Sequence, residues 1–187
     1  MESQIRDLGK AFAVSAIVLI VQLFGWYYSD SLALLGDTGH VLSDLLAIGA
    51  SLLAMMLAAR AATSRRTFGF HRVEVFAALF NGMLLVLMAL LIAYEAMQRY
   101  GTIHVVNSLP MMVTSVIGLC GNLYVVYNLQ HEENLNVRSA FIHAAGDALS
   151  SVGVLIGAII IMFTGLYAVD VVVSLLIATL ILFSAYT

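Results

Sequence analysis

Six nearly uninterrupted apolar stretches make up most of this 187-residue chain, at 11–28, 31–59, 73–98, 108–129, 136–164 and 166–186. A bilayer core of ~30 Å takes about 20 apolar residues for each helical crossing, so stretches of this length can span it. Transmembrane β-strands would instead alternate apolar and polar residues over about 10 positions. The pattern predicts an all-α membrane protein, a six-transmembrane-helix bundle in which residues 1–187 form a single transmembrane domain.

The composition excludes most other classes of protein. Apolar residues make up 62% of the chain and charged residues 10%, against about 45–50% and about 25% in soluble domains. Such a chain cannot cover itself with polar surface, so a soluble enzyme, a disordered tail and a nucleic-acid-binding protein are excluded. The sequence has no glycine-rich phosphate loop, nucleophile elbow or His-Glu-x-x-His motif, so we do not expect an enzyme. Cys120 is the only cysteine, which rules out an intrachain disulfide.

Basic residues gather on one side of the predicted bundle. With six crossings, both termini share a side with the connections at 60–72 and 130–136. Seven of the eight basic residues fall there, namely Arg6, Lys10, Arg60, Arg65, Arg66, Arg72 and Arg138, and Arg99 lies on the other side. Because Lys and Arg concentrate in cytoplasmic loops, we expect a multi-pass protein of the bacterial inner membrane with both termini in the cytoplasm.

Five ionisable residues lie deep within the apolar stretches, where each costs roughly 2.5–3.5 kcal/mol on insertion scales and usually faces a cavity. They are Asp37, His40, Asp44, His143 and Asp147. Two stretches each contain His-x-x-x-Asp, a spacing that places both side chains on one helix face. Two imidazoles and two carboxylates suit tetrahedral Zn²⁺. The sequence therefore predicts a metal site formed by His40, Asp44, His143 and Asp147.

The depths of the two His-x-x-x-Asp pairs agree with one shared site. At 1.5 Å per residue, His40 lies ~14 Å and Asp44 ~20 Å from the end at which their helix begins. The later helix enters from the opposite side of a ~30 Å core, which places Asp147 at ~14 Å and His143 at ~20 Å. His40 is therefore predicted to face Asp147, and Asp44 to face His143, near the middle of the bilayer.

Other interpretations of the polar residues stay open. For the quartet, the alternative is a pair of structural His–Asp salt bridges in a proton-conducting or structural membrane subunit that binds no metal. Asp37 is interpreted as a group that orients His40 or carries a proton, or as a plain interhelical hydrogen bond. Asn81 and Asn122 are placed with Asp37 as supporting or proton-relay residues, and otherwise as interhelical hydrogen bonds.

Three segments of the chain carry the motifs of a known family. They are Ser31-Leu-Ala-Leu-Leu-Gly-Asp-Thr-Gly-His-Val-Leu-Ser-Asp44, Arg66-Thr-Phe-Gly-Phe-His-Arg-Val-Glu74 followed by Asn81, and His143-Ala-Ala-Gly-Asp-Ala-Leu-Ser-Ser-Val-Gly-Val154. Over nearly its whole length the chain resembles the zinc-type cation diffusion facilitators. The resemblance implies six helices with a tetrahedral metal site between the second and the fifth, carried here by His40, Asp44, His143 and Asp147.

The same resemblance implies a homodimer in the lipid bilayer that exports Zn²⁺ from the cytoplasm in exchange for protons, with Cd²⁺, Co²⁺ and Mn²⁺ as further candidates. Metal ligation needs neutral His and ionised Asp, so metal binding competes with protons. A His at the position of His40 accompanies zinc selectivity in that family. The His-rich loop of many members is replaced here by Gln130-His-Glu-Glu-Asn-Leu-Asn136, and no C-terminal cytoplasmic domain is expected in this chain.

Overall fold

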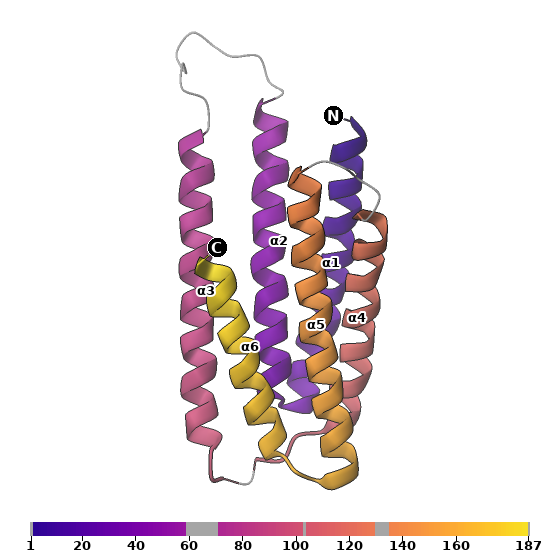
Figure 1. The fold of residues 1–187 in the computed structure, drawn as a ribbon, viewed down its shortest axis with the longest axis vertical. Coiled ribbons are helices and arrows are strands. Elements are labelled where there is room, and N and C mark those ends of the chain that lie inside the picture. The colour runs from indigo at the N-terminus through magenta and orange to yellow at the C-terminus, as the bar shows by residue number, and fades with distance from the viewer. Residues whose placement is uncertain (1, 59–70, 103, 130–134, 187) are drawn as a thin grey trace.

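The structure is a computed structural model that describes residues 2–58, 71–102, 104–129 and 135–186; within these ranges it describes the side chains except those of 2–8, 11, 47–48, 50–58, 71–78, 128–129, 135–144 and 186. The described residues form six helices and no strand (Figure 1). The helices are α1 (Glu2–Ser29), α2 (Leu32–Ala58), α3 (His71–Arg99), α4 (Ser108–Leu129), α5 (Leu135–Thr164) and α6 (Ala168–Tyr186). The predicted all-helical fold with six helices is confirmed.

The observed helices differ from the apolar stretches mainly at two ends. α1 begins at Glu2, well before the apolar stretch, because polar residues such as Glu, Gln, Arg and Lys also favour helix. An apolar stretch therefore marks the part of a helix that lies in lipid, and the helix itself can extend further. α5 ends at Thr164, because Gly165 adopts a left-handed conformation (φ 66°) and donates its N–H to the carbonyl of Ile161 at 2.8 Å. After this turn α6 begins at Ala168, two residues later than the apolar stretch.

α2 lies at the centre of the bundle and packs against α1, α3, α5 and α6. α1, α2, α5 and α4 form a closed ring in which each helix contacts the next, and α4 contacts α1. α3 and α6 pack on each other and against α2, beside this ring (Figure 1). α2 and α5 are therefore neighbours in this ring and are in direct contact with each other.

The described connecting residues 30–31, 100–102, 104–107 and 165–167 lie at one end of the bundle, which we call the Asp30 end (Figure 1, bottom). Arg99 Nη1 donates to the backbone carbonyl of Asp30 at 2.8 Å, and Arg99 Nη2 lies 3.2 Å from Asp30 Oδ1. His104 Nε2 lies 2.6 Å from Asp30 Oδ2, with both side chains partly exposed. Asp30 adopts φ 55°, a left-handed conformation that Asp tolerates better than most residues. These contacts tie the α1–α2 turn to α3 and to the loop before α4.

Asp170 fastens α6 to the beginning of α2. Its carboxylate is buried, with 1% of the residue exposed. It accepts hydrogen bonds from Ser31 Oγ at 2.6 Å, from the Leu32 N–H at 2.7 Å and from the Ala33 N–H at 3.3 Å. These N–H groups belong to the first turn of α2, which has no partners within its own helix. Asp170 therefore satisfies the N-terminus of α2 from a neighbouring helix.

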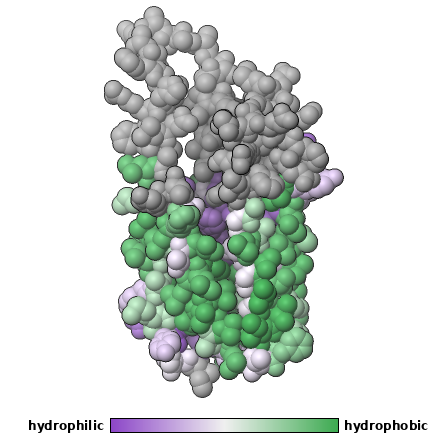
Figure 2. All heavy atoms as spheres, viewed as in Figure 1, coloured by the Kyte–Doolittle hydropathy of each residue, from purple (hydrophilic) through white to green (hydrophobic). Residues whose placement is uncertain are grey.

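The outer surface of the bundle is apolar. Over the coloured part of the face in Figure 2, hydrophobic residues predominate, with hydrophilic residues at the Asp30 end and in a small area between the hydrophobic flanks. Large apolar side chains such as Phe24, Leu79, Met83 and Phe163 are exposed, as lipid contact requires. Among the described residues, α1, α3, α4, α5 and α6 contain spans long and apolar enough to cross a bilayer. The chain is a multi-pass membrane protein.

Candidate metal site

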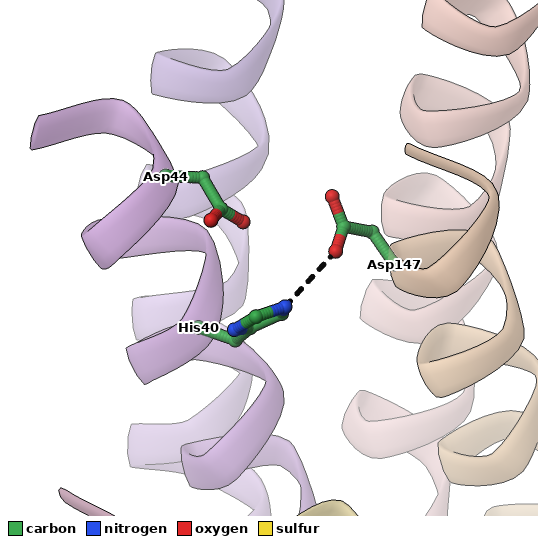
Figure 3. A group of neighbouring side chains, drawn as sticks. All are labelled: His40, Asp44 and Asp147. Carbon is green, nitrogen blue, oxygen red and sulfur yellow. Dashed lines mark ion pairs between the residues drawn. The ribbon is translucent and has the colours of Figure 1, made fainter. Parts of the chain in front are cut away.

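His40 and Asp44 lie one turn apart on α2 and point toward Asp147 on α5 (Figure 3). One potential ligand atom from each residue lies within 4.8 Å of those of the other two. His40 Nε2 and Asp147 Oδ1 are 3.1 Å apart. His40 and Asp147 thus face each other as the sequence predicts. Together with Asp44, one turn from His40 on α2, they form one cluster.

The charges of this cluster favour a bound cation. Asp44 and Asp147 are each 9% exposed, and the side chains of His40 and Asp147 are each 12% exposed. Two ionised carboxylates at about 4.8 Å repel each other by roughly 3 kcal/mol at an effective dielectric constant of about 20. A proton or a divalent ion placed between them removes this repulsion, and a divalent ion adds attraction to both. The cluster is therefore suited to holding positive charge.

The donor set fits zinc. One imidazole nitrogen and two carboxylate oxygens are ligands that Zn²⁺ accepts, and it takes four in a tetrahedron. His143 is predicted to be the fourth ligand. It lies on α5 one turn before Asp147, so its backbone is on the correct helix and near the correct face. Its side chain lies outside the described residues, so the pairing of His143 with Asp44 stays a prediction.

Asp37 lies on α2 one turn from His40 and is almost completely buried, with 1% exposed. Its Oδ1 accepts a hydrogen bond from Ser150 Oγ at 2.6 Å. Its Oδ2 accepts one from Gln22 Nε2 at 2.6 Å and one from Ser151 Oγ at 3.2 Å. Asp37 therefore joins α1, α2 and α5 beside the cluster. Asp37 therefore forms interhelical hydrogen bonds. A further role in orienting His40 or in carrying a proton stays a prediction.

The two asparagines also bond between helices. Asn122 Nδ2 on α4 donates to Ser151 Oγ on α5 at 3.3 Å. Asn81 Oδ1 on α3 accepts from Ser43 Oγ on α2 at 2.7 Å. Asn122 is thereby linked to Asp37 through Ser151. Asn81 instead bonds from α3 to Ser43, the residue that precedes Asp44 on α2. A role for either in proton transfer stays a prediction.

Ser150 and Ser151 carry little signal in the sequence. Serine in an apolar helix commonly donates to a carbonyl of its own preceding turn, as Ser115 does to Met111 at 2.6 Å. The one hint is the spacing of three and four residues from Asp147, which places both serines on the face of α5 that bears the ligand. Only the arrangement of helices reveals that this face meets Asp37.

The family model for the cation efflux transmembrane domain matches residues 10–187 of this chain. The match includes α2 and α5 with all of the residues of the cluster and the predicted fourth ligand. It covers nearly the whole chain, and its description agrees with the apolar surface and the helical fold.

Curated proteins with similar sequences include metal transporters of bacteria. The zinc transporter ZitB of Escherichia coli (strain K12) is 41% identical over 99% of this chain and 60% of its own length. The cadmium, cobalt and zinc/H⁺-K⁺ antiporter of Bacillus subtilis (strain 168) is 39% identical over 95% of this chain and 60% of its own. The metal cation efflux system protein CzcD of Cupriavidus metallidurans is 40% identical over 95% and 57%. The chain thus spans about 60% of the length of these relatives.

Proposed function

The chain belongs to the family of cation efflux transmembrane domains, and from this premise we propose that it carries divalent metal ions, Zn²⁺ first among them, out of the cytoplasm in exchange for protons. The family consists of transporters, so the chain is not an enzyme. The observation that carries the proposal is the convergence of His40, Asp44 and Asp147 within 4.8 Å in the interior of an apolar bundle. Ionisable side chains inside a membrane bundle usually mark the path of an ion or a proton, which supports a role of this cluster in binding a cation.

We assign the transported ion to a tetrahedral site of His40, Asp44, Asp147 and His143. Nitrogen and oxygen donors in this number suit Zn²⁺, and Cd²⁺, Co²⁺ or Mn²⁺ could use the same donors with less favourable geometry or softness. The names of similar proteins, which include zinc, cadmium and cobalt transporters, support this choice of ions.

Exchange for protons follows from the chemistry of these ligands. An imidazole must be neutral and a carboxylate ionised before either can bind metal, so an arriving proton displaces the ion and an arriving ion displaces protons. A site that faces each side of the membrane in turn would then couple the two flows. The Bacillus subtilis relative is named a cadmium, cobalt and zinc/H⁺-K⁺ antiporter, which supports an exchange mechanism.

The orientation and assembly belong to the same proposal. The excess of Lys and Arg on one side of the bundle supports cytoplasmic termini, with the Asp30 end facing outward. The resemblance to the cation diffusion facilitators supports a homodimer. Light scattering of the purified protein in detergent would measure its mass and test the dimer.

Zn²⁺ flux into proteoliposomes tests the function directly, with and without an imposed pH gradient. The matched variants are Asp44→Ala and His143→Ala, and the control is His104→Ala, whose contact with Asp30 lies at the exposed end of the bundle. We expect flux that depends on the gradient, is lost in both site variants and is kept in the control. Absence of both flux and Zn²⁺ binding in the unaltered chain would favour the alternative, a proton-conducting or structural subunit.

A further inference from the structure

A second polar cluster lies one helical turn from the candidate metal site, toward the Asp30 end. We call it the Asp37 cluster; it consists of Gln22, Asp37, Asn122, Ser150 and Ser151. Asp37 precedes His40 by three residues on α2, and the two serines follow Asp147 by three and four residues on α5. α2 begins at the Asp30 end and α5 finishes there, so both steps lead in the same direction.

The metal site and the Asp37 cluster are therefore two successive cross-links between the same faces of α2 and α5. The first joins His40 to Asp147 at 3.1 Å. The second joins Asp37 to Ser150 at 2.6 Å and to Ser151 at 3.2 Å. Because each link joins two specific side chains at hydrogen-bond distance, the links constrain the register between the two helices.

The Asp37 cluster is also fixed by the other helices of the ring. Gln22 on α1 donates to Asp37, and Asn122 on α4 donates to Ser151, so all four ring helices contribute. Gln22 and Ser151 are fully buried, with 0% exposed. Gly118 on α4 leaves the space that the Gln22 amide occupies, since a Cβ there would lie 2.9 Å from Gln22 Nε2. The carboxylate of Asp37 is thus held directly from α1 and α5, and from α4 through Ser151.

We infer that Ser150 and Ser151 are positioning residues of the metal site: through Asp37 they fix the rotation and height of α5 against α2, so that Asp147 faces His40. The inference rests on the proposed function, because it assumes that the site binds metal. Groups that orient metal ligands typically change metal affinity by 10–100-fold when removed. Ser150 has the shorter bond to Asp37 and is the more informative residue to change.

The first test is Zn²⁺ affinity, measured by calorimetric titration of the full chain in detergent. We expect Ser150→Ala to weaken binding at least tenfold, a range typical of groups that support metal ligands, and Ser150→Thr, which keeps the hydroxyl, to restore most of it. Ser115→Ala is the matched control. Ser115 is also buried and donates a 2.6 Å hydrogen bond, but to the Met111 carbonyl of its own helix α4, so its loss should leave the affinity unchanged.

The second test measures the register itself. Spin labels at Leu42 on α2 and Leu149 on α5, both exposed, report the distance between the helices in a Cys120→Ala background. Without metal, we expect a broader distance distribution in Ser150→Ala than in the parent chain. Added Zn²⁺ should narrow it again, which also shows that the variant is folded.

Two results would overturn the inference, and they differ from each other. If the parent chain binds Zn²⁺ in a manner that depends on Asp44, and Ser150→Ala matches it in affinity and distance distribution, the serines do not position the site although the proposed function stands. If the parent chain binds no Zn²⁺, the proposed function fails and the inference fails with it.

Discussion

Two sets of buried acids in this bundle are held in opposite ways. Asp170 accepts three hydrogen bonds, from one hydroxyl and two N–H groups at the start of α2. Asp44 and Asp147 instead converge on each other and on His40 within 4.8 Å. The hydrogen-bond donors around Asp170 compensate the cost of burying its carboxylate. Two ionised carboxylates that face each other repel, and a cation between them removes this repulsion. Asp170 therefore differs from the carboxylates of the candidate metal site in its surroundings rather than in its burial.

Removal of a converging carboxylate should have the largest effect. We expect Asp147→Ala to weaken Zn²⁺ binding by more than roughly 100-fold, since even groups that only support a ligand are worth 10–100-fold. Stability should fall little, because the change also removes a charge from the interior. Titration with Zn²⁺ measures the affinity, and thermal unfolding measures the stability. An unchanged affinity would place the ion elsewhere in the molecule.

Removal of the saturated carboxylate should act on stability. We expect Asp170→Ala to lower the free energy of unfolding by about 3 kcal/mol, because each buried donor left without a partner costs about 1–3 kcal/mol. Asp170→Asn, which keeps one acceptor, should lose less. Denaturation in mixed detergent micelles measures this loss, and Zn²⁺ titration of the folded fraction should give an affinity within about threefold of the parent chain. If Asp170→Ala kept full stability but no longer bound Zn²⁺, Asp170 would belong to the metal site and not to the structural carboxylates.

Acidification should weaken metal binding at the converging site. Protons compete with the metal for every imidazole ligand, so each histidine in the site makes the Zn²⁺ affinity fall more steeply as the pH drops. We expect the Zn²⁺ affinity of the parent chain to fall on acidification below neutral pH. A shallower fall in His143→Ala would identify His143 as a second histidine ligand. The same pH dependence in both proteins would exclude it.

The exposed His–Asp contact should matter least. His104 and Asp30 lie 2.6 Å apart, closer than His40 and Asp147, yet their side chains are 40% and 55% exposed. Exposed pairs of this kind contribute less than about 1 kcal/mol. His104→Ala should therefore change the unfolding free energy by less than this amount and leave Zn²⁺ flux intact. A large loss of flux would mean that this end of the bundle takes part in transport.

Local patterns in the sequence predict the helices and part of the site. The length of each apolar stretch specifies a crossing, and the His-x-x-x-Asp spacing places His40 and Asp44 on one face opposite Asp147. The start of α1 at Glu2 is not predicted, because hydropathy identifies the part of a helix that lies in lipid and not its polar extension.

Contacts between distant segments could not be predicted. Asp170 meets the start of α2 from 138 residues away in sequence, and Ser150 meets Asp37 from 113 residues away. Serine also forms hydrogen bonds within its own helix, so a serine in an apolar helix and the residues around it do not indicate a partner on another helix. The role of His143 stays a prediction from spacing and resemblance.

Visible absorption of the Co²⁺-loaded protein tests the central claim most directly, because the intensity of the Co²⁺ bands distinguishes four-coordinate from six-coordinate ions. The account predicts one Co²⁺ per chain with an intense tetrahedral spectrum, displaced by Zn²⁺ and absent from Asp147→Ala. Ser115→Ala, which loses only a hydrogen bond within α4, should give the spectrum of the parent chain. A weak octahedral spectrum, or the same tetrahedral spectrum in Asp147→Ala, would contradict a site between α2 and α5.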